Sequence, residues 1–260
     1  MALGDGGSDG DGKTTAHNVR SVSLCEKARW ALDWHGIAYE EVGWPPGLHQ
    51  ILAKRRGLKE AKVPIVFDGE DVVQGTVAIV DWADRKDQNQ DRTLTPKAER
   101  SEASEIENRV GEVIGIHVRR LAFAELLPAH AHVVKSALFH GATGWRRLAG
   151  SVMWPVSRRV MVRVFDIVPG AAEESRSKLE EEFDWLEEKL ADGRTYLIGD
   201  RFSRADLTVA SLLAQFARPN ELATHHAMSG SDSLAAVVDR WSKRPIMRWV
   251  RSQYEMHRAG

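Results

Sequence analysis

Residues 63–74 read VPIVFDGEDVVQ, and this stretch decides the fold. Two runs rich in β-branched residues flank Asp68-Gly69, and an Asp-Gly pair between two such runs is typical of a β-hairpin. Pro64 stands at the beginning of the first run. The stretch therefore predicts two antiparallel strands, the first of them initiated by proline.

The residues before and after the hairpin alternate between strand and helix patterns. Ala28, Ala31 and Leu32 repeat at helical spacing, and Gly36 ends that helix. The elements expected around the hairpin are a strand over His17–Ser21, a helix over Cys25–His35, a strand over Ala38–Val42, a short helix near His49–Arg56 and a closing helix over Thr76–Arg85. This β-α-β-α-β-β-α order predicts a compact α/β domain over residues 17–86.

The second half of the chain shows helical patterns only. Residues 87–97 (DQNQDRTLTPK) are polar and include a proline, which predicts a linker to an all-helical domain over residues 98–255. Ser203 and Asp206 form a capping-box pattern before an apolar helix. Residues 1–16 are rich in glycine and aspartate, so we expect a disordered tail there. Another amphipathic helix presents one apolar face made of Leu179, Phe183, Leu186 and Leu190.

Composition excludes several classes of protein. The 36 Lys and Arg residues balance 37 Asp and Glu residues, so no overall charge recruits nucleic acid or a membrane. A single cysteine, Cys25, excludes an internal disulfide framework and a cysteine-rich zinc site, and it fits a reducing compartment. No apolar run is long enough to insert across a membrane, and the first residues lack the order of a signal peptide. We therefore expect a cytoplasmic protein.

The charges are nevertheless unevenly distributed along the chain. Residues 117–163 carry eight Lys and Arg against Glu125 alone, whereas residues 166–192 carry ten acids against three bases. Two interpretations remain open. Consecutive helices of opposite charge can shield each other, or the basic stretch can form a surface for an anionic partner.

An α/β unit with a Pro-initiated hairpin, joined to an all-helical half, resembles a cytosolic glutathione transferase. The segments that carry the resemblance, in the order typical of that family, are Ser23–Leu32 with Gly36–Glu40, Lys62–Val66, Val73–Ile79 and Ile198–Asp206. The resemblance implies a thioredoxin-like N-terminal domain, a helical-bundle C-terminal domain, a cis bond before Pro64 and a homodimer. It also implies glutathione as co-substrate, an apolar electrophile as second substrate and a role in detoxification.

Such an enzyme must convert the glutathione thiol into a thiolate, which is the nucleophile. Lowering a thiol pKa by about two units requires about 2.7 kcal/mol. A helix N-terminus supplies about 0.3–1 kcal/mol, and one hydrogen bond to a charged group about 1.5–3 kcal/mol. A hydroxyl at the start of the first helix is therefore the expected device, and Ser23 stands there.

The chain departs from the family pattern at this position. Counting back seven residues from Arg29, the usual spacing, reaches Val22, which Ser21 and Ser23 flank. We expect Ser23 to activate the thiol, with Ser21 as the alternative, although either serine can instead simply cap the helix. Cys25 is a third candidate, because a cysteine at a helix N-terminus can form a mixed disulfide with glutathione; its other interpretation is a small buried packing residue.

The glutathione pocket is expected around the hairpin. A cis bond before Pro64 turns the backbone of Val63 outward, where the cysteinyl amide of glutathione can pair with it as an added strand. Thr76 and the N–H groups near it can receive the γ-glutamyl carboxylate, unless Thr76 only caps its helix. Gly75 stands where many relatives place an acid, and Gln74 offers only a neutral acceptor.

Two function classes follow. The first is an enzyme that activates the glutathione thiol for attack on an electrophilic small molecule, with a Cys25-based glutathione-dependent thiol-disulfide reductase as a variant. The second is a non-catalytic binding or scaffold protein on the same fold, which the residues Val22 and Gly75 favour. Spacing predicts no metal site from His130, His132 and His140. The apolar wall of the enzyme pocket is expected from Val113, Ile116, Phe123 and Leu127.

Overall fold

The computed structural model describes residues 13–18, 23–58, 60, 62–87, 89–222 and 231–258. Ser21 and Val22 lie outside the described residues, as does most of the predicted tail. The last residues of that tail are wrongly predicted, because the first strand already begins at Thr15. Ala16 in that strand is buried, which explains why the strand extends into the polar segment.

The strands form one mixed sheet in the order β2-β1-β3-β4. The predicted hairpin is confirmed, with its strands paired antiparallel from Ile65 with Gln74 to Asp68 with Asp71. The strand β1 pairs parallel with β2 and antiparallel with β3. The four strands are β1 (Thr15–Asn18), β2 (Glu40–Gly43), β3 (Ile65–Asp68) and β4 (Asp71–Gln74).

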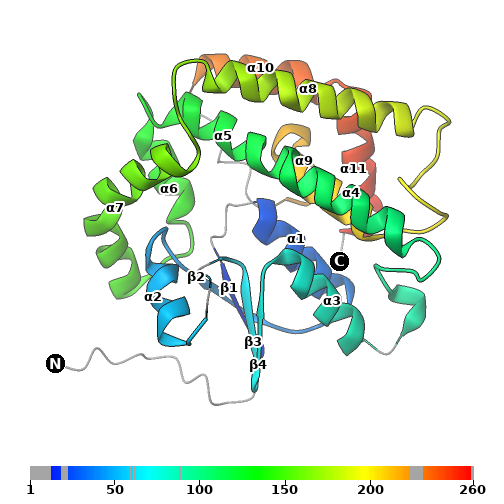
Figure 1. Cartoon of the computed structure of the whole chain (residues 1–260), viewed down its shortest axis with the longest axis horizontal. Helices are drawn as coiled ribbons and strands as arrows, with labels where there is room; N and C mark the ends of the chain where they lie inside the picture. Colours follow the sequence, from blue (N-terminus) through cyan, green and yellow to red (C-terminus); the bar gives the residue numbers. More distant parts are fainter. Residues whose placement is uncertain are drawn as a thin grey trace.

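Three helices complete this half of the molecule: α1 (Ser23–Trp34), α2 (Leu48–Arg55) and α3 (Thr76–Lys86). Alternate side chains of β3 point to opposite faces of the sheet, as strand geometry requires. Val66 packs in one cluster with residues of α1 and α3 on one face. On the other face, Ile65 and Phe67 pack with Trp44 and with Leu48 of α2. Helices therefore cover both faces, and α1 and α3 separate the sheet from the helical half (Figure 1).

The rest of the described chain is helical, as the sequence predicts. A short 3-10 helix lies within the predicted linker, and α9 forms the buried centre of the helical half (Figure 1). The capping box of Ser203 and Asp206 at the start of α9 is confirmed. The helices are η1 (Gln90–Arg92), α4 (Arg100–Glu112), α5 (Ile114–Leu126), α6 (Ala131–Leu138), α7 (Gly144–Val164), α8 (Ala171–Lys189), α9 (Arg204–Ala217), α10 (Asp232–Ser242) and α11 (Pro245–His257).

A buried ion cluster joins the sheet half to the helical half. Glu107 of α4 accepts from the ammonium group of Lys27 in α1 and lies 2.6 Å from Nε of Arg204 in α9. All three side chains are almost fully buried. Arg204 also donates to Asp81 of α3 at 2.7 Å. The carboxylate of Glu107 therefore links α1, α4 and α9, and Arg204 extends the cluster to α3.

The uneven charge of the helical half is partly neutralised within the molecule. The acidic helix α8 pairs with α5 through Arg120 and Glu174 at 2.6 Å, and with α4 through Arg109 and Glu182 at 2.9 Å. This confirms the shielding interpretation for α5 and α8. The basic helix α7 takes part in no ion pair among the described residues, so shielding does not account for its charge.

Candidate functional site

Most of the predicted site residues lie near one end of the strands. His17, near the end of β1, pairs with Ile65 at the beginning of β3, and Ile65 pairs with Gln74 at the end of β4. Asn18 pairs with Gly43 at the end of β2. At this end of the sheet β1, β2 and β4 finish and β3 begins. We call it the site end of the sheet.

Three segments predicted to bind glutathione start or end at the site end of the sheet. The helix α1 begins at Ser23, four residues after β1; Val63-Pro64 directly precedes β3, and Thr76 begins α3 just after β4. The free N–H groups of two helix N-termini thus lie near a segment of extended backbone. Backbone donors and helix dipoles of this kind favour anionic ligand groups.

Cys25 lies in the first turn of α1 and is fully buried. Two cations influence it: the guanidinium groups of Arg29 on α1 and of Arg119 on α5 both interact electrostatically with its sulfur. Burial opposes the charge of Arg29, but the carboxylates of Glu26 and Glu41 raise the pKa of Arg29 above its usual value. Because Glu26 and Glu41 pair with Arg29 at 2.8 Å and 2.9 Å, Arg119 is the less compensated of the two cations near Cys25.

Arg119 is a cation near Cys25 that sequence reasoning missed. Its Nε–H donates to the carbonyl of Gly115 at 2.7 Å, and its guanidinium lies 5.3 Å from the centre of the Phe165 ring. No carboxylate pairs with Arg119 among the described residues, and burial lowers the pKa of Arg119. Its positive charge is thus poorly compensated, which favours an anion beside it.

The bond between Val63 and Pro64 is cis, as the resemblance implies. Val63 is half-buried and packs against the core of the helical half, so the segment lies between the two halves. Gln74 donates from Nε2 to the carbonyls of Glu60 and Lys62, at 2.8 Å each. Gln74 therefore braces the chain before Pro64, and only its Oε1 remains for the predicted acceptor role.

Gly75 and Thr76 form the start of α3. Gly75 is the N-cap and has a φ of 89°, a conformation that strains any residue with a Cβ. The backbone conformation at this position therefore favours glycine over a residue with a Cβ. The interpretation of Thr76 as the helix cap is wrong, because Thr76 is the first helical residue and no side chain caps α3.

Three of the four residues predicted to form the apolar wall have side chains that are not fully buried, and the wall itself stays a prediction. Ile116 on α5 is 45% exposed, and Phe123 is half-buried with its ring 4.9 Å from the ring of Phe165. Val113, the residue between α4 and α5, is half-buried. Leu127 is wrongly predicted: it is only 1% exposed because it packs into the core of the helical half.

Helix α7 covers the loop that follows β2, a contact that no sequence pattern predicted. Ser157 donates to the carbonyl of Pro46 at 3.2 Å, and the guanidinium of Arg146 lies 5.4 Å from the Trp44 ring. Trp44 donates in turn to Nδ1 of His17 in β1 at 2.9 Å. The helical half thus reaches the site end of the sheet from α7 as well as from α5.

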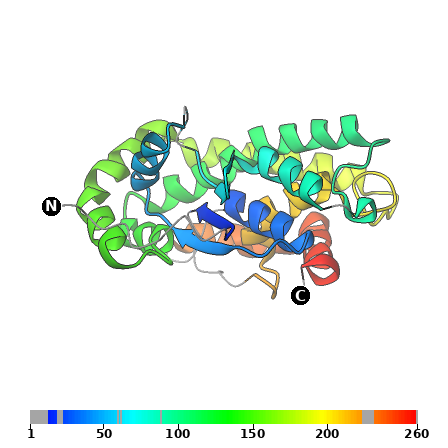
Figure 2. The ribbon, with the colours of Figure 1, turned by 90° about the horizontal axis from the view of Figure 1, so that it is seen from below.

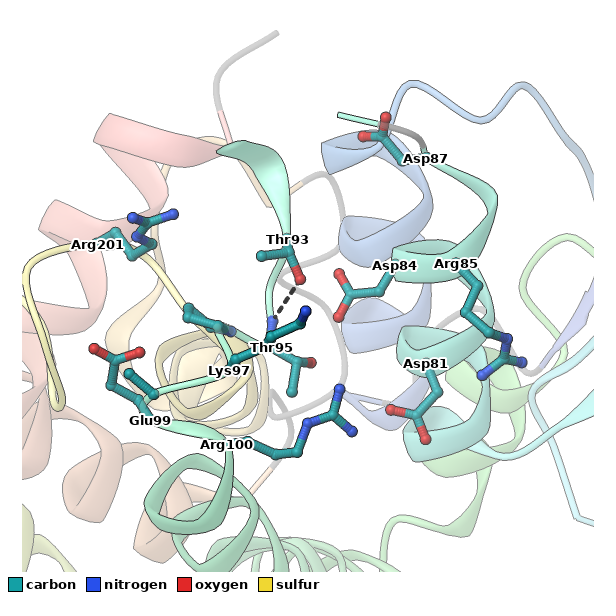
Figure 3. Close-up of a pocket in the computed structure, with 12 residues that line it drawn as sticks. Asp81, Asp84, Arg85, Asp87, Thr93, Thr95, Lys97, Glu99, Arg100 and Arg201 are labelled. Atoms are coloured by element: carbon teal, nitrogen blue, oxygen red, sulfur yellow. Dashed lines mark hydrogen bonds between the residues drawn. The ribbon is translucent and has the colours of Figure 1, made fainter. Parts of the chain in front are cut away.

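A separate cavity of about 910 Å³ lies at the opposite end of α3. Acidic and basic side chains both line it (Figure 3), and two of these acids, Asp84 and Asp87, lie 3.0 Å and 2.9 Å from the ring nitrogens of His35. Burial opposes protonation of His35, but these two carboxylates raise its pKa. None of the predicted glutathione residues lines this cavity. The charged side chains around it are those of Asp81, Asp84, Arg85, Asp87, Lys97, Glu99, Arg100 and Arg201.

Two further searches concern the described residues only. No group of three or more His, Cys, Asp or Glu side chains there is arranged to hold a metal ion. None of the helices in the described part of the chain is long and apolar enough to span a membrane.

Two family models match the chain. The model of the glutathione S-transferase N-terminal domain matches residues 19–91, and the model of the glutathione S-transferase C-terminal domain matches residues 169–244. Together they cover more than half of the chain. The first match includes the whole site end of the sheet except β1. Comparison with curated protein sequences finds no significant match.

Solved structures share the fold along almost the whole chain. The β-etherase LigF from Sphingobium sp. strain SYK-6 is 17% identical, with a TM-score of 0.59 over 93% of this chain and 99% of that one. A human theta-class glutathione transferase, bound to the glutathione conjugate of 1-menaphthyl sulfate, is also 17% identical, with a TM-score of 0.56 over 95% and 90% of the two chains. The theta-class enzyme of Xanthomonas axonopodis pv. citri, solved with glutathione, is 20% identical, with a TM-score of 0.51 over 90% and 95%. With its mixed four-stranded sheet, its helical second half and both family models in order, the chain belongs to the glutathione S-transferase family.

Proposed function

We propose that this protein binds glutathione at the site end of the sheet and activates its thiol for attack on an electrophilic small molecule. The observation that carries the proposal is the convergence there of the α1 N-terminus, the Val63 backbone and the α3 N-terminus. Each of these segments can bind a different chemical group of glutathione. Several structural relatives were solved with glutathione or a glutathione derivative, which supports the same ligand here.

The three parts of glutathione fit the three segments by their chemistry. The γ-glutamyl carboxylate is an anion and suits the uncapped N–H groups at the start of α3, with the hydroxyl of Thr76 beside them. The cysteinyl amide can pair with the backbone of Val63 as an added strand. This arrangement directs the thiol toward the start of α1, where Ser23 is the residue we propose as hydrogen-bond donor.

Two contributions then favour the thiolate over the thiol. The α1 N-terminus and one hydroxyl together supply about 2–4 kcal/mol. The second contribution is the cation of Arg119, whose charge no carboxylate among the described residues neutralises. The leaving proton passes to solvent, and the thiolate attacks an electrophile held against the half-buried face that includes Phe123.

Titration calorimetry with glutathione tests the proposal. We expect binding tighter than millimolar, and about tenfold weaker binding for Thr76→Val, because a hydrogen bond to the γ-glutamyl carboxylate is lost. Thr195→Val is the matched control, since Thr195 is exposed in the loop before α9 and should leave the affinity unchanged. Absence of binding at millimolar glutathione supports the non-catalytic scaffold instead.

The burial of Cys25 weighs against the thiol-disulfide reductase. A mixed disulfide with glutathione needs an accessible sulfur, and Cys25 has no exposed surface. Mass spectrometry after incubation with oxidised glutathione separates the two enzymes. We expect an unmodified thiol, whereas a stable glutathionyl adduct on Cys25 favours the reductase.

A further inference from the structure

The outer face of α7 carries an exposed row of aliphatic side chains. Its members recur every four residues, so they share one helix face, and their exposed fractions run from 48% to 75%. Single exposed aliphatic residues are ordinary on protein surfaces, but a continuous row is typical of an interaction surface. The row, which we call the valine row, consists of Leu148, Val152, Val156, Val160 and Val164.

Positive charge accompanies the valine row. Arg159 and Arg163 lie one position before Val160 and Val164, on the adjoining line of the same helix, and both are exposed. Residues 126–165 contain no Asp or Glu. Five acids of α8 pair with arginines outside that helix and two pair with bases of α8 itself, and no ion pair among the described residues neutralises this face of α7. A partner that binds this face must therefore offer both apolar groups and negative charge.

A second copy of the chain meets this requirement poorly. A twofold contact places the same patch of two subunits against each other. Such a contact through the valine row would bring Arg159 and Arg163 next to the same arginines of the other subunit, without an acid from either α7. Like charges that meet without a counter-charge oppose association.

A membrane surface of anionic lipids meets the requirement well. An amphipathic helix lies in the plane of such a surface with its apolar face at the boundary between headgroups and acyl chains, while arginines reach the phosphates. The helix α7 forms one end of the molecule in both views, so its outer face is open to a broad surface (Figures 1 and 2).

We propose that α7 adsorbs to membranes rich in anionic lipids, with the valine row in the headgroup boundary and Arg159 and Arg163 on lipid phosphates. The helix lies in the plane of the surface and does not span the bilayer, because five arginines interrupt its 21 residues. The inference does not depend on glutathione binding. It concerns a face of α7 that points away from the site end of the sheet.

Flotation of the full chain with lipid vesicles tests the proposal. We expect the protein to float with phosphatidylcholine vesicles that contain phosphatidylglycerol and to stay behind with phosphatidylcholine alone. The double variant R159Q/R163Q should partition about 25-fold less, because each arginine contributes about fivefold. The variant V152N/V160N should partition at least about tenfold less, because two aliphatic side chains no longer enter the boundary.

Matched controls replace exposed side chains away from α7. Arg85→Gln with Arg100→Gln removes two arginines near α3 and α4, and Met256→Asn removes an exposed apolar side chain of α11. Neither control should change the partition, and circular dichroism should show all variants folded.

Three results would overturn the proposal. The first is no flotation with the anionic vesicles, and the second is flotation that both α7 variants leave unchanged. The third is a concentration-dependent dimer, seen by analytical ultracentrifugation, that V152N/V160N abolishes while the wild type ignores vesicles. That last result would assign the valine row to a second copy of the chain.

Discussion

At the scale of single residues, the chemistry depends on what lies beside the start of α1. The spacing in the sequence places the expected hydroxyl position at Val22, and Ser23 is the first residue of α1. The free N–H groups of the first turn and the helix dipole favour an anion there. We therefore choose Ser23 over Ser21, which belonged to the predicted strand in the sequence.

Replacing Ser23 by alanine should raise the pKa of the bound glutathione thiol by about 1–2 units, because one hydrogen bond to the thiolate is lost. Glutathione affinity should change little, since the contacts to Val63 and Thr76 remain. An ultraviolet titration of thiolate absorbance measures the shift, and Ser21→Ala is the matched control. If only Ser21→Ala moves the curve, Ser21 is the activating hydroxyl.

Arg119 gives a second prediction about the same thiol. Replacing Arg119 by glutamine removes a nearby cation and should raise the pKa of the bound thiol by about one unit. The control is Arg147→Gln, which removes an exposed arginine at the far side of α7. An unchanged titration curve in Arg119→Gln would show that the guanidinium does not face the thiol.

At the scale of elements, local patterns were predicted well and contact-dependent features were not. The hairpin and the capping box of α9 were correct because their residues are close in the sequence. The strand β1 starts two residues earlier than predicted, since its limits depend on pairing with β2 and β3. Arg119 was missed for a similar reason, because only tertiary packing brings α5 beside Cys25.

The capping box of α9 should be worth several kcal/mol. The carboxylate of Asp206 accepts from the N–H of Leu197 at 2.8 Å and from the N–H of Ser203 at 2.9 Å. Asp206→Ala leaves these buried donors unsatisfied and should lower the free energy of unfolding by about 3 kcal/mol. Urea denaturation measures this loss of stability. The control Asp200→Ala, in an exposed turn, should stay within about 0.5 kcal/mol, and an equally small loss for Asp206→Ala would contradict the prediction.

At the scale of the whole molecule, the two halves are held together by packing around α9 and by the buried cluster of Glu107. The sequence predicted a sheet domain at 17–86 and a helical domain at 98–255, and those limits stay a prediction. It could not predict that Lys27 and Arg204, far apart in the chain, share one carboxylate. Burial lowers the pKa of Lys27, and the charge and the hydrogen bond of Glu107 oppose that effect.

Replacing Glu107 by alanine leaves two cations buried without their shared partner. The free energy of unfolding should fall by about 3–5 kcal/mol, the usual result of breaking a buried ion pair from one side. Thermal and urea denaturation both measure the loss. Glu112→Ala, an exposed acid at the end of the same helix, is the control and should cost less than about 0.5 kcal/mol. A loss below about 1 kcal/mol in Glu107→Ala would mean that water or neighbouring acids replace the carboxylate.

The burial of Cys25 also makes the protein a reporter of its own fluctuations. Because Cys25 is the single cysteine of the chain and is fully buried, a thiol reagent can modify the protein only when the start of α1 opens. The modification rate, compared with that of an unfolded peptide, therefore gives the free energy of this local opening without any engineered label. A bound ligand that holds α1 in place must slow the reaction. The modification rate of Cys25 therefore reports both the opening of the site and the binding of a ligand there.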